Sequence, residues 1–218
     1  NSIFDTIENE LKKGAKTIIA VGNNQTYNQT INALVRQYTL NSVYKKIPLG
    51  FIPVGNKNNE IADYLGYTSE EASCGILSAR RIQKLDLAQA NNIFFLSQAV
   101  ITTVNTTLEI DKNYTIEINE SGEIAVINLP AMQKLPLEIN SNAKDGILEL
   151  FIKSNKTKKY LPLNLGQTNQ SIFSFKKLRI INPSSQVVLD SSIKLQTPVA
   201  ISISNFKINL IVGKNRQF

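Results

Sequence analysis

The pattern of apolar and polar positions in the first eighty residues predicts alternating helices and strands. A helical spacing of apolar residues runs from Ser2, which can act as an N-cap, to Gly14, which can end the helix. Residues 17–21 and 49–54 are short apolar runs, and such runs are typical of parallel strands buried on both faces. Each run leads through a polar turn into a further helical pattern, at 31–38 and at about 60–80. Two strand–loop–helix units in succession predict an open α/β sheet within residues 1–80.

From residue 81 the pattern changes to many short strands. Apolar and polar residues alternate clearly at 115–119, and the following Glu-Ser-Gly-Glu at 120–123 is typical of a hairpin turn. The predicted strands are 81–87, 93–104, 107–119, 123–129, 146–153, 173–181, 186–190 and 198–212. This succession of strands without a long helix predicts an antiparallel sandwich or barrel over residues 81–218. No linker precedes it, so we expect it to pack closely against the α/β part.

The composition excludes several kinds of catalysis. The chain of 218 residues contains no histidine and one cysteine. A Ser-His-Asp or Cys-His mechanism, an internal disulfide and a cysteine-rich zinc site are therefore excluded. Any catalysis would depend on carboxylates, hydroxyls, lysines, backbone amides or an oxygen-bound cation. The single cysteine, Cys74, lies in an apolar helical pattern, and we expect it to be a small buried residue.

The positive charge is concentrated in the second part of the chain. Lys and Arg number 24 against 17 Asp and Glu, and most of the excess lies in residues 81–218. Its clusters are Lys153, Lys156, Lys158 and Lys159, and Lys176, Lys177 and Arg179. Such clusters are either solvated surface or a contact for anionic lipid headgroups or nucleic acid. No nucleic-acid motif accompanies them, which favours the lipid. No apolar run is long enough to span a bilayer, so we expect a cytoplasmic protein, with peripheral membrane contact as the alternative.

Two polar loops stand where ligands bind in open α/β sheets. Residues 22–26 (Gly-Asn-Asn-Gln-Thr) and 55–59 (Gly-Asn-Lys-Asn-Asn) each follow a predicted strand and precede a helical pattern. Free backbone N–H groups and the helix dipole at such a place favour a phosphate group. The alternative for either loop is an ordinary polar turn.

The loops and several later segments resemble a known family. Residues 22–34 are similar to the nucleotide-binding segment of diacylglycerol kinase-type lipid kinases, which usually reads Gly-Gly-Asp-Gly-Thr. Residues 49–66 resemble that family's second loop, Ile-Pro-x-Gly-Thr-x-Asn, and residues 80–96 its Asp-Leu-Gly and Phe-Leu region. Residues 142–148 resemble its Asn-x-Asp-Gly-x-Leu turn, and residues 188–192 fall at its Leu-Asp-Gly-Glu. The resemblance implies the NAD kinase/diacylglycerol kinase-like fold.

In that fold a partial open α/β domain, here residues 1–80, is followed by an antiparallel β-sandwich domain, here residues 81–218. The resemblance also implies sites for ATP and Mg²⁺ in an active member. The residues at the nucleotide-binding positions are Gly22, Asn23, Asn24, Thr26, Gly55, Asn56, Lys57 and Asn58. Asp190 stands at the catalytic position, and Asp145 at that of a Mg²⁺ ligand. The alternative for Asp145 is a simple Asp-Gly turn.

Several residues depart from the family pattern. Asn23 and Gln25 replace glycines of the first loop, and Asn24 replaces its carboxylate. Ser192 replaces the late glutamate, and serine has no pKa suited to proton abstraction. Because phosphoryl transfer depends on positioning and charge neutralisation, such losses compound. We therefore expect a degenerate lipid kinase-like protein, a pseudokinase that binds nucleotide or lipid with little or no phosphotransfer. One alternative is an active ATP-dependent lipid kinase, in which Lys57 would neutralise phosphate charge and Asp190 would act as the base. The other is a non-catalytic structural or assembly subunit.

The family's first strand–helix–strand unit, with its Asn-Pro-x-Ser-Gly loop, is not found before the helix at residues 2–14. A sheet without that unit would have a parallel strand at its edge. This predicts either an upstream segment or a contact with a protein partner or a second copy of the chain.

Overall fold

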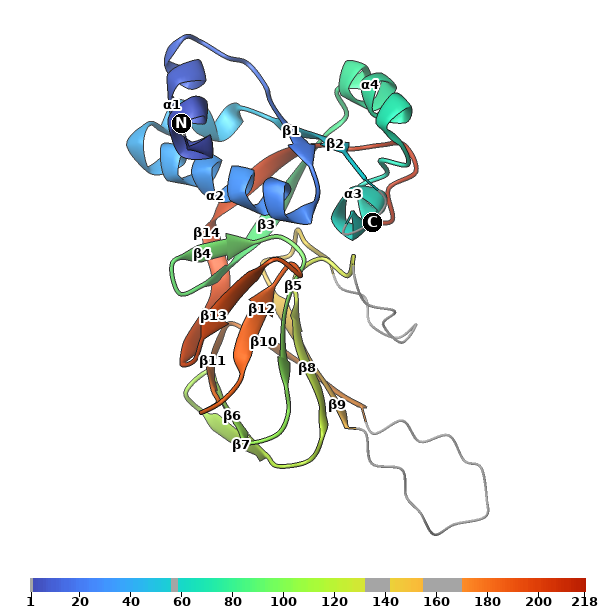
Figure 1. Cartoon of the computed structure of the whole chain (residues 1–218). Helices are drawn as coiled ribbons and strands as arrows, with labels where there is room; N and C mark the ends of the chain where they lie inside the picture. Colours follow the sequence, from blue (N-terminus) through green and yellow to red (C-terminus); the bar gives the residue numbers. More distant parts are fainter. Residues whose placement is uncertain (1, 56–58, 132–141, 155–169) are drawn as a thin grey trace, which may run out of the picture.

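The computed structural model describes residues 2–55, 59–131, 142–154 and 170–218. Figure 1 shows an α/β layer in the upper part and two facing sheets below it, with the long strand β14 running between the two parts. The helices are α1 (Ile3–Lys12), α2 (Asn24–Leu40), the 3-10 helix η1 (Ser42–Lys46), α3 (Glu60–Tyr64) and α4 (Glu70–Ala79). Within the described residues, no helix is long and apolar enough to cross a membrane.

The described strands form two sheets. The larger has eight strands, with β1 and β2 parallel to each other, β2 parallel to β14, and the remaining pairs antiparallel. Its strands are β1 (Ile18–Gly22), β2 (Leu49–Pro53), β3 (Ile82–Ala90), β4 (Ile93–Phe95), β6 (Thr106–Ile110), β7 (Tyr114–Ile118), β11 (Lys177–Ile181) and β14 (Val199–Ile211). The smaller, antiparallel sheet runs in the order β10 (Gln170–Phe175), β9 (Leu148–Ser154), β8 (Gly122–Ile127), β5 (Gln98–Thr102), β12 (Gln186–Leu189) and β13 (Ile193–Gln196). The predicted α/β layer followed by a β-sandwich is confirmed.

The local signals placed most elements correctly. Ser2 caps α1 in a capping box with Asp5, whose backbone N–H donates to Ser2 Oγ over 3.1 Å. Three predicted strands are each two strands: 93–104, 107–119 and 173–181 are divided by turns. The turn between β6 and β7 contains Asp111 and Lys112 with positive φ, a conformation in which aspartate is enriched but lysine is not. Strand β13 was not predicted. The hairpin predicted at residues 120–123 is wrong, because β7 pairs with β6 in the larger sheet and β8 pairs with β5 and β9 in the smaller one.

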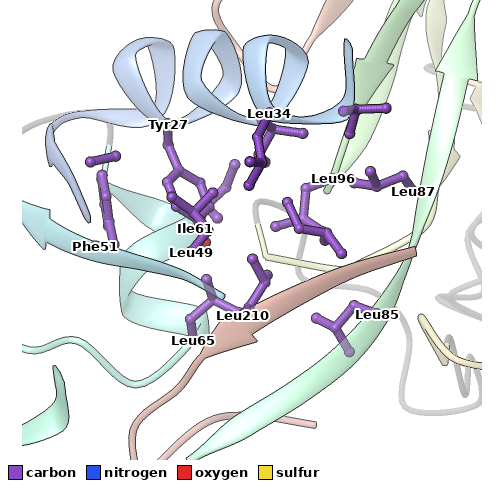
Figure 2. Close-up of a cluster of buried hydrophobic side chains, with 14 of the residues drawn as sticks. Tyr27, Leu34, Leu49, Phe51, Ile61, Leu65, Leu85, Leu87, Leu96 and Leu210 are labelled. Carbon is purple, nitrogen blue, oxygen red and sulfur yellow. The ribbon is translucent and has the colours of Figure 1, made fainter. Parts of the chain in front are cut away.

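The α/β core is built from both parts of the chain. In Figure 2, Tyr27 and Leu34 of α2 face Leu49 of β2, while Leu85 of β3 and Leu210 of β14 close the cluster from the other side. All five side chains are buried. A second buried cluster lies between the two facing sheets and includes Phe95, Leu150, Leu178, Val187 and Ile201. Strands β3 and β14 contribute to both clusters, and the predicted division at residue 80 stays a prediction.

The prediction that the strand at residues 17–21 is buried on both faces is wrong. Strand β1 is the last strand of the larger sheet, and Ile19 and Val21 are 46% and 57% exposed. Helix α4 packs on the neighbouring β2, where its Leu77 occupies the space that a Cβ on Gly50 would need. Because α4 covers β2 and not β1, the face that carries Ile19 and Val21 remains open.

The expectation for Cys74 is also wrong. Its thiol is exposed, because α4 lies on the surface and has Ser73 as its buried residue. Partial contact with the core comes instead from Ile76 and Leu77. An apolar helical pattern therefore did not identify which face of this helix is covered.

Candidate functional site

The two predicted ligand loops lie side by side. Gly22 at the end of β1 pairs with Pro53 at the end of β2, and the Val54 N–H donates to the Gly22 carbonyl over 2.9 Å. The first loop runs directly into α2 and the second toward α3. The carboxyl ends of the two parallel strands therefore bring Gly22 and Gly55, where the two loops begin, to one edge of the sheet.

The first loop satisfies its own amide groups. Asn23 is the N-cap of α2, and its Oδ1 accepts hydrogen bonds from Gln25 N (3.0 Å) and Thr26 N (3.3 Å). The expectation of free N–H groups at this helix end is wrong for these two residues. Asparagine at a position where the family has glycine supplies a cap, and that cap takes up donors that a phosphate would need.

Position 22 requires glycine, because Thr26 lies too close for a larger residue. A Cβ on Gly22 would lie 2.7 Å from Thr26 Cβ, closer than side chains approach one another. Beside this contact, a groove of about 440 Å³ follows β1, lined by Ile19 and Val21 and reaching Thr26. The half-buried Thr26, the last residue of the first loop, therefore borders an accessible groove.

The Asn24 side chain is buried and forms hydrogen bonds with the first two residues of α3. Its side chain is 1% exposed; Nδ2 donates to Glu60 Oε2 over 2.7 Å and Oδ1 accepts from Ile61 N over 3.4 Å. Asn24 thus joins the start of α2 to the start of α3. The amide that replaces the family's carboxylate serves as a cross-link in this structure.

The second loop begins at Gly55, which has φ of +82°. The Asn59 side chain closes the loop by donating to the Gly55 carbonyl over 2.7 Å. Asn56, Lys57 and Asn58 lie outside the described residues. Their predicted roles in nucleotide binding stay predictions.

Asp190 is fully buried and accepts four hydrogen bonds. Its Oδ1 accepts from Ser97 N (2.8 Å) and Gln98 N (2.9 Å). Its Oδ2 accepts from Leu96 N (2.8 Å) and from Asn28 Nδ2 (2.9 Å). The carboxylate therefore holds together α2, the segment between β4 and β5, and the end of β12.

Burial raises the pKa of Asp190, because removing the carboxylate from water disfavours its charged form. The four N–H donors act in the opposite direction. Ser192, at the position of the family's glutamate, is half-buried, and its Oγ donates to the Leu189 carbonyl over 3.4 Å. The Asp190 carboxylate, with four N–H donors on it, is thus withdrawn from solvent.

A second amide continues this network. Asn32, one turn along α2 from Asn28, donates to the Asn28 carbonyl (2.9 Å) and Oδ1 (2.7 Å). It also bonds Phe94 of β4 in both directions, donating to its carbonyl and accepting from its N–H, each over 2.8 Å. Helix α2 is thereby fixed to the sandwich by polar bonds as well as by apolar packing.

Asp145 lies in the predicted Asp-Gly turn, where its Oδ1 accepts from Ile147 N over 3.0 Å. The carbonyl of the preceding residue, Lys144, accepts from Lys207 Nζ over 3.4 Å. Mg²⁺ requires several oxygen ligands, and Asp145 could supply one carboxylate oxygen that does not take part in the turn. Within the described residues, no group of three or more Asp, Glu or Cys side chains is arranged to hold a metal ion. The metal role of Asp145 stays a prediction.

Sequence reasoning missed the residue that anchors this turn. Asp86 of β3 is 2% exposed; its Oδ1 lies 2.6 Å from Lys207 Nζ and its Oδ2 accepts from Gly146 N over 2.8 Å. Asn128 adds bonds to the Asp86 and Leu96 carbonyls. The Asp–Lys pair joins β3 to β14 at the β-bulge, a long-range pairing that no local pattern signals.

The structure thus combines parallel strands, which carry polar loops at their carboxyl ends, with two facing sheets. No protein-family model matches the sequence. Among curated proteins, it is similar to a "Putative lipid kinase" of Staphylococcus carnosus (strain TM300), with 23% identity over 252 residues, covering 95% of this chain and 80% of that protein.

The structure of the chain is also similar to solved structures of kinases. A diacylglycerol kinase from Bacillus anthracis str. Sterne superimposes with a TM-score of 0.73 at 18% identity, covering 97% of this chain and 81% of that one. An NAD kinase from Archaeoglobus fulgidus in complex with ATP superimposes with a TM-score of 0.56 at 11% identity, covering 99% and 92%. The chain therefore has the diacylglycerol kinase-like fold, which confirms the fold that the resemblance implied.

Proposed function

We propose that this lipid kinase-like protein binds a nucleotide or a lipid and has little or no phosphotransfer activity. The observation that carries the proposal is the burial and hydrogen bonding of the Asp190 carboxylate. A general base must have an acceptor within reach of the hydroxyl that it deprotonates. The Asp190 carboxylate is buried and accepts four N–H groups, and Ser192 stands where the family has a second carboxylate.

The nucleotide would bind at the two adjoining loops. Gly22 and Gly55 have no side chain, so a ligand could approach the backbone at this edge of the sheet. The NAD kinase from Archaeoglobus fulgidus, which has a similar fold, was solved in complex with ATP. The Asn23 cap competes for Gln25 N and Thr26 N, so a phosphate would have to displace it. We therefore expect nucleotide binding to be weak.

The lipid would bind in a hollow of about 670 Å³ between α1, α2, β4 and β13. Phe4, Ile93 and Phe94 give it apolar walls, and Arg36 lies over the Phe4 ring at 4.2 Å. A volume of this size with one cationic group suits an acyl chain with a polar head. The name of the Staphylococcus carnosus relative supports a lipid as the ligand class.

Thermal denaturation with each ligand tests the proposal. We expect a small, saturable rise in Tm with ATP and Mg²⁺, with diacylglycerol in detergent micelles, or with both. Ile93→Glu should abolish the lipid-induced shift measured against its own ligand-free Tm. Ile172→Glu, a matched change at an exposed position on β10, should preserve it. Turnover with a panel of lipids should equal that of a control without protein.

Two outcomes contradict the proposal. Steady phosphorylation of a lipid would favour the active kinase. The absence of any shift with both ligands would favour the structural or assembly subunit.

A further inference from the structure

Two turns of the sandwich are tied together by one carboxylate. Asp111 and Lys112 form the turn between β6 and β7 with φ of +51° and +61°. Asp111 Oδ1 accepts from Lys176 N (3.1 Å) and Lys177 N (2.7 Å) in the turn between β10 and β11. The Asp111 N–H also donates to the Lys177 carbonyl over 2.8 Å. The lysines of the two turns are therefore presented together by an ordered backbone.

These lysines line a hollow of about 620 Å³, which we call the lysine hollow. Its lining includes Lys112, Lys176, Lys177, Asp111, Ile147 and Ser174. All three lysines are exposed, and in the described part of the chain no carboxylate forms an ion pair with them. The Asp111 carboxylate is directed to backbone amides. Three lysines and one aspartate thus line the hollow, and its net positive charge attracts anions.

The charge cluster predicted from the sequence differs from the one in the structure. Arg179 pairs with Glu109 on the adjacent strand over 3.3 Å, so its charge is partly compensated. Lys112, distant in sequence, takes its place beside Lys176 and Lys177. Lys156, Lys158 and Lys159 lie outside the described residues.

We propose that the lysine hollow binds the phosphate-bearing headgroup of an anionic phospholipid in a bilayer. Ammonium groups and the Ser174 hydroxyl are donors for phosphate oxygens. Ile147 at the rim is 39% exposed, and Tyr114, which follows the β6–β7 turn, is 70% exposed. An exposed isoleucine in the lining and an amphipathic tyrosine two positions after Lys112 suit the boundary between headgroups and acyl chains.

This membrane contact goes beyond ligand binding at the loops and does not depend on it. Vesicle binding is measured without nucleotide, so its failure is distinguishable from failure of the proposed function. The test is co-sedimentation of the full chain with vesicles of phosphatidylcholine alone or mixed with phosphatidylglycerol. We expect binding to the mixed vesicles only, weakening as salt is raised.

Substitution of the three lysines by glutamine should weaken the binding. A lysine near an anionic surface changes affinity by about fivefold, so the triple variant should lose on the order of 100-fold. The same positions changed to arginine should keep the binding, which separates charge from misfolding. The control triple Lys16→Gln, Lys46→Gln and Lys214→Gln removes the same charge at other exposed positions.

Three results would overturn the assignment. Equal losses in the two glutamine triples would show attraction by net charge alone. Equal binding to both kinds of vesicle would show that anionic headgroups are not recognised. Saturable stabilisation by inorganic phosphate without vesicle binding would identify a soluble anion as the ligand.

Discussion

The side-chain amide of Asn28 donates to Asp190 Oδ2 over 2.9 Å, across 162 positions of sequence. Both side chains are fully buried. Asn28 belongs to the helix that leaves the first ligand loop, and Asp190 directly follows β12 of the sandwich. The bond therefore fixes the two layers of the molecule to each other.

Replacement of Asp190 by asparagine should destabilise the fold. The asparagine oxygen can accept from part of the donor set, while its amide group faces the remaining N–H donors and leaves them without acceptors. Each buried donor without an acceptor costs about 1–3 kcal/mol, so we expect a loss of about 3 kcal/mol. Denaturant unfolding measures this loss. Asn28→Ala removes one of the four donors and should cost less; a larger loss for Asn28→Ala would contradict a role of Asp190 as the centre of the network.

The contribution of Asp190 to stability should depend on pH. Burial raises its pKa in the folded state above the ordinary value of 3.8. The folded state therefore binds the proton more tightly than the unfolded state does. The favourable contribution is fully present below the ordinary pKa and is lost as the pH rises through the raised folded pKa. The difference in unfolding free energy between wild type and Asp190→Asn should fall over that window. A difference that grows with pH would show that the four donors outweigh burial.

Lys207→Met should destabilise the junction of β3 and β14. It removes the ammonium group 2.6 Å from the buried Asp86 carboxylate. Because Lys207 is itself 42% exposed, we expect a loss of about 1–3 kcal/mol, below that of a fully buried pair. Asp86→Asn in the same chain keeps an acceptor for Gly146 N and should restore part of the loss. Additive losses in the double variant would show that the two side chains do not interact.

Gly22→Ala and Gly75→Ala should have opposite effects. A Cβ on Gly22 collides with Thr26, so the substitution should cost about 1–3 kcal/mol. Gly75 lies in α4, where a Cβ meets no atom within 4 Å, and alanine should stabilise the helix by about 0.5–1 kcal/mol. Thermal unfolding of both variants measures the difference. Equal effects would mean that the contact between Gly22 and Thr26 is not required.

The sequence predicted the elements whose causes are local. Ser2 and its capping partner and the two parallel strands with their polar loops are set by nearby residues. Their spacing also supported the kinase-like fold. The exposure of Ile19 depends on where α4 packs, and that position is decided by tertiary contacts.

Within the site, the residue types pointed to particular positions but did not indicate the residues to which these side chains bond. Asn24 and Asp190 were predicted as site residues from the sequence, whereas their hydrogen bonds to Glu60 and to residues 96–98 join segments distant in the chain. The Asp86–Lys207 pair was missed because it depends on the register of β3 against β14. The partners of such side chains depend on the topology of the fold, which cannot be read residue by residue from a single sequence.

Transfer of labelled phosphate from the γ-position of ATP to diacylglycerol is the most direct test of the proposed loss of phosphotransfer. Wild type, Asp190→Asn and Asn28→Ala are compared with Mg²⁺ present, after circular dichroism has shown that each variant is folded. The proposal predicts transfer at the level of the control without protein for all three chains. Transfer by wild type that is lost in folded Asp190→Asn would contradict it and identify Asp190 as a working catalytic carboxylate.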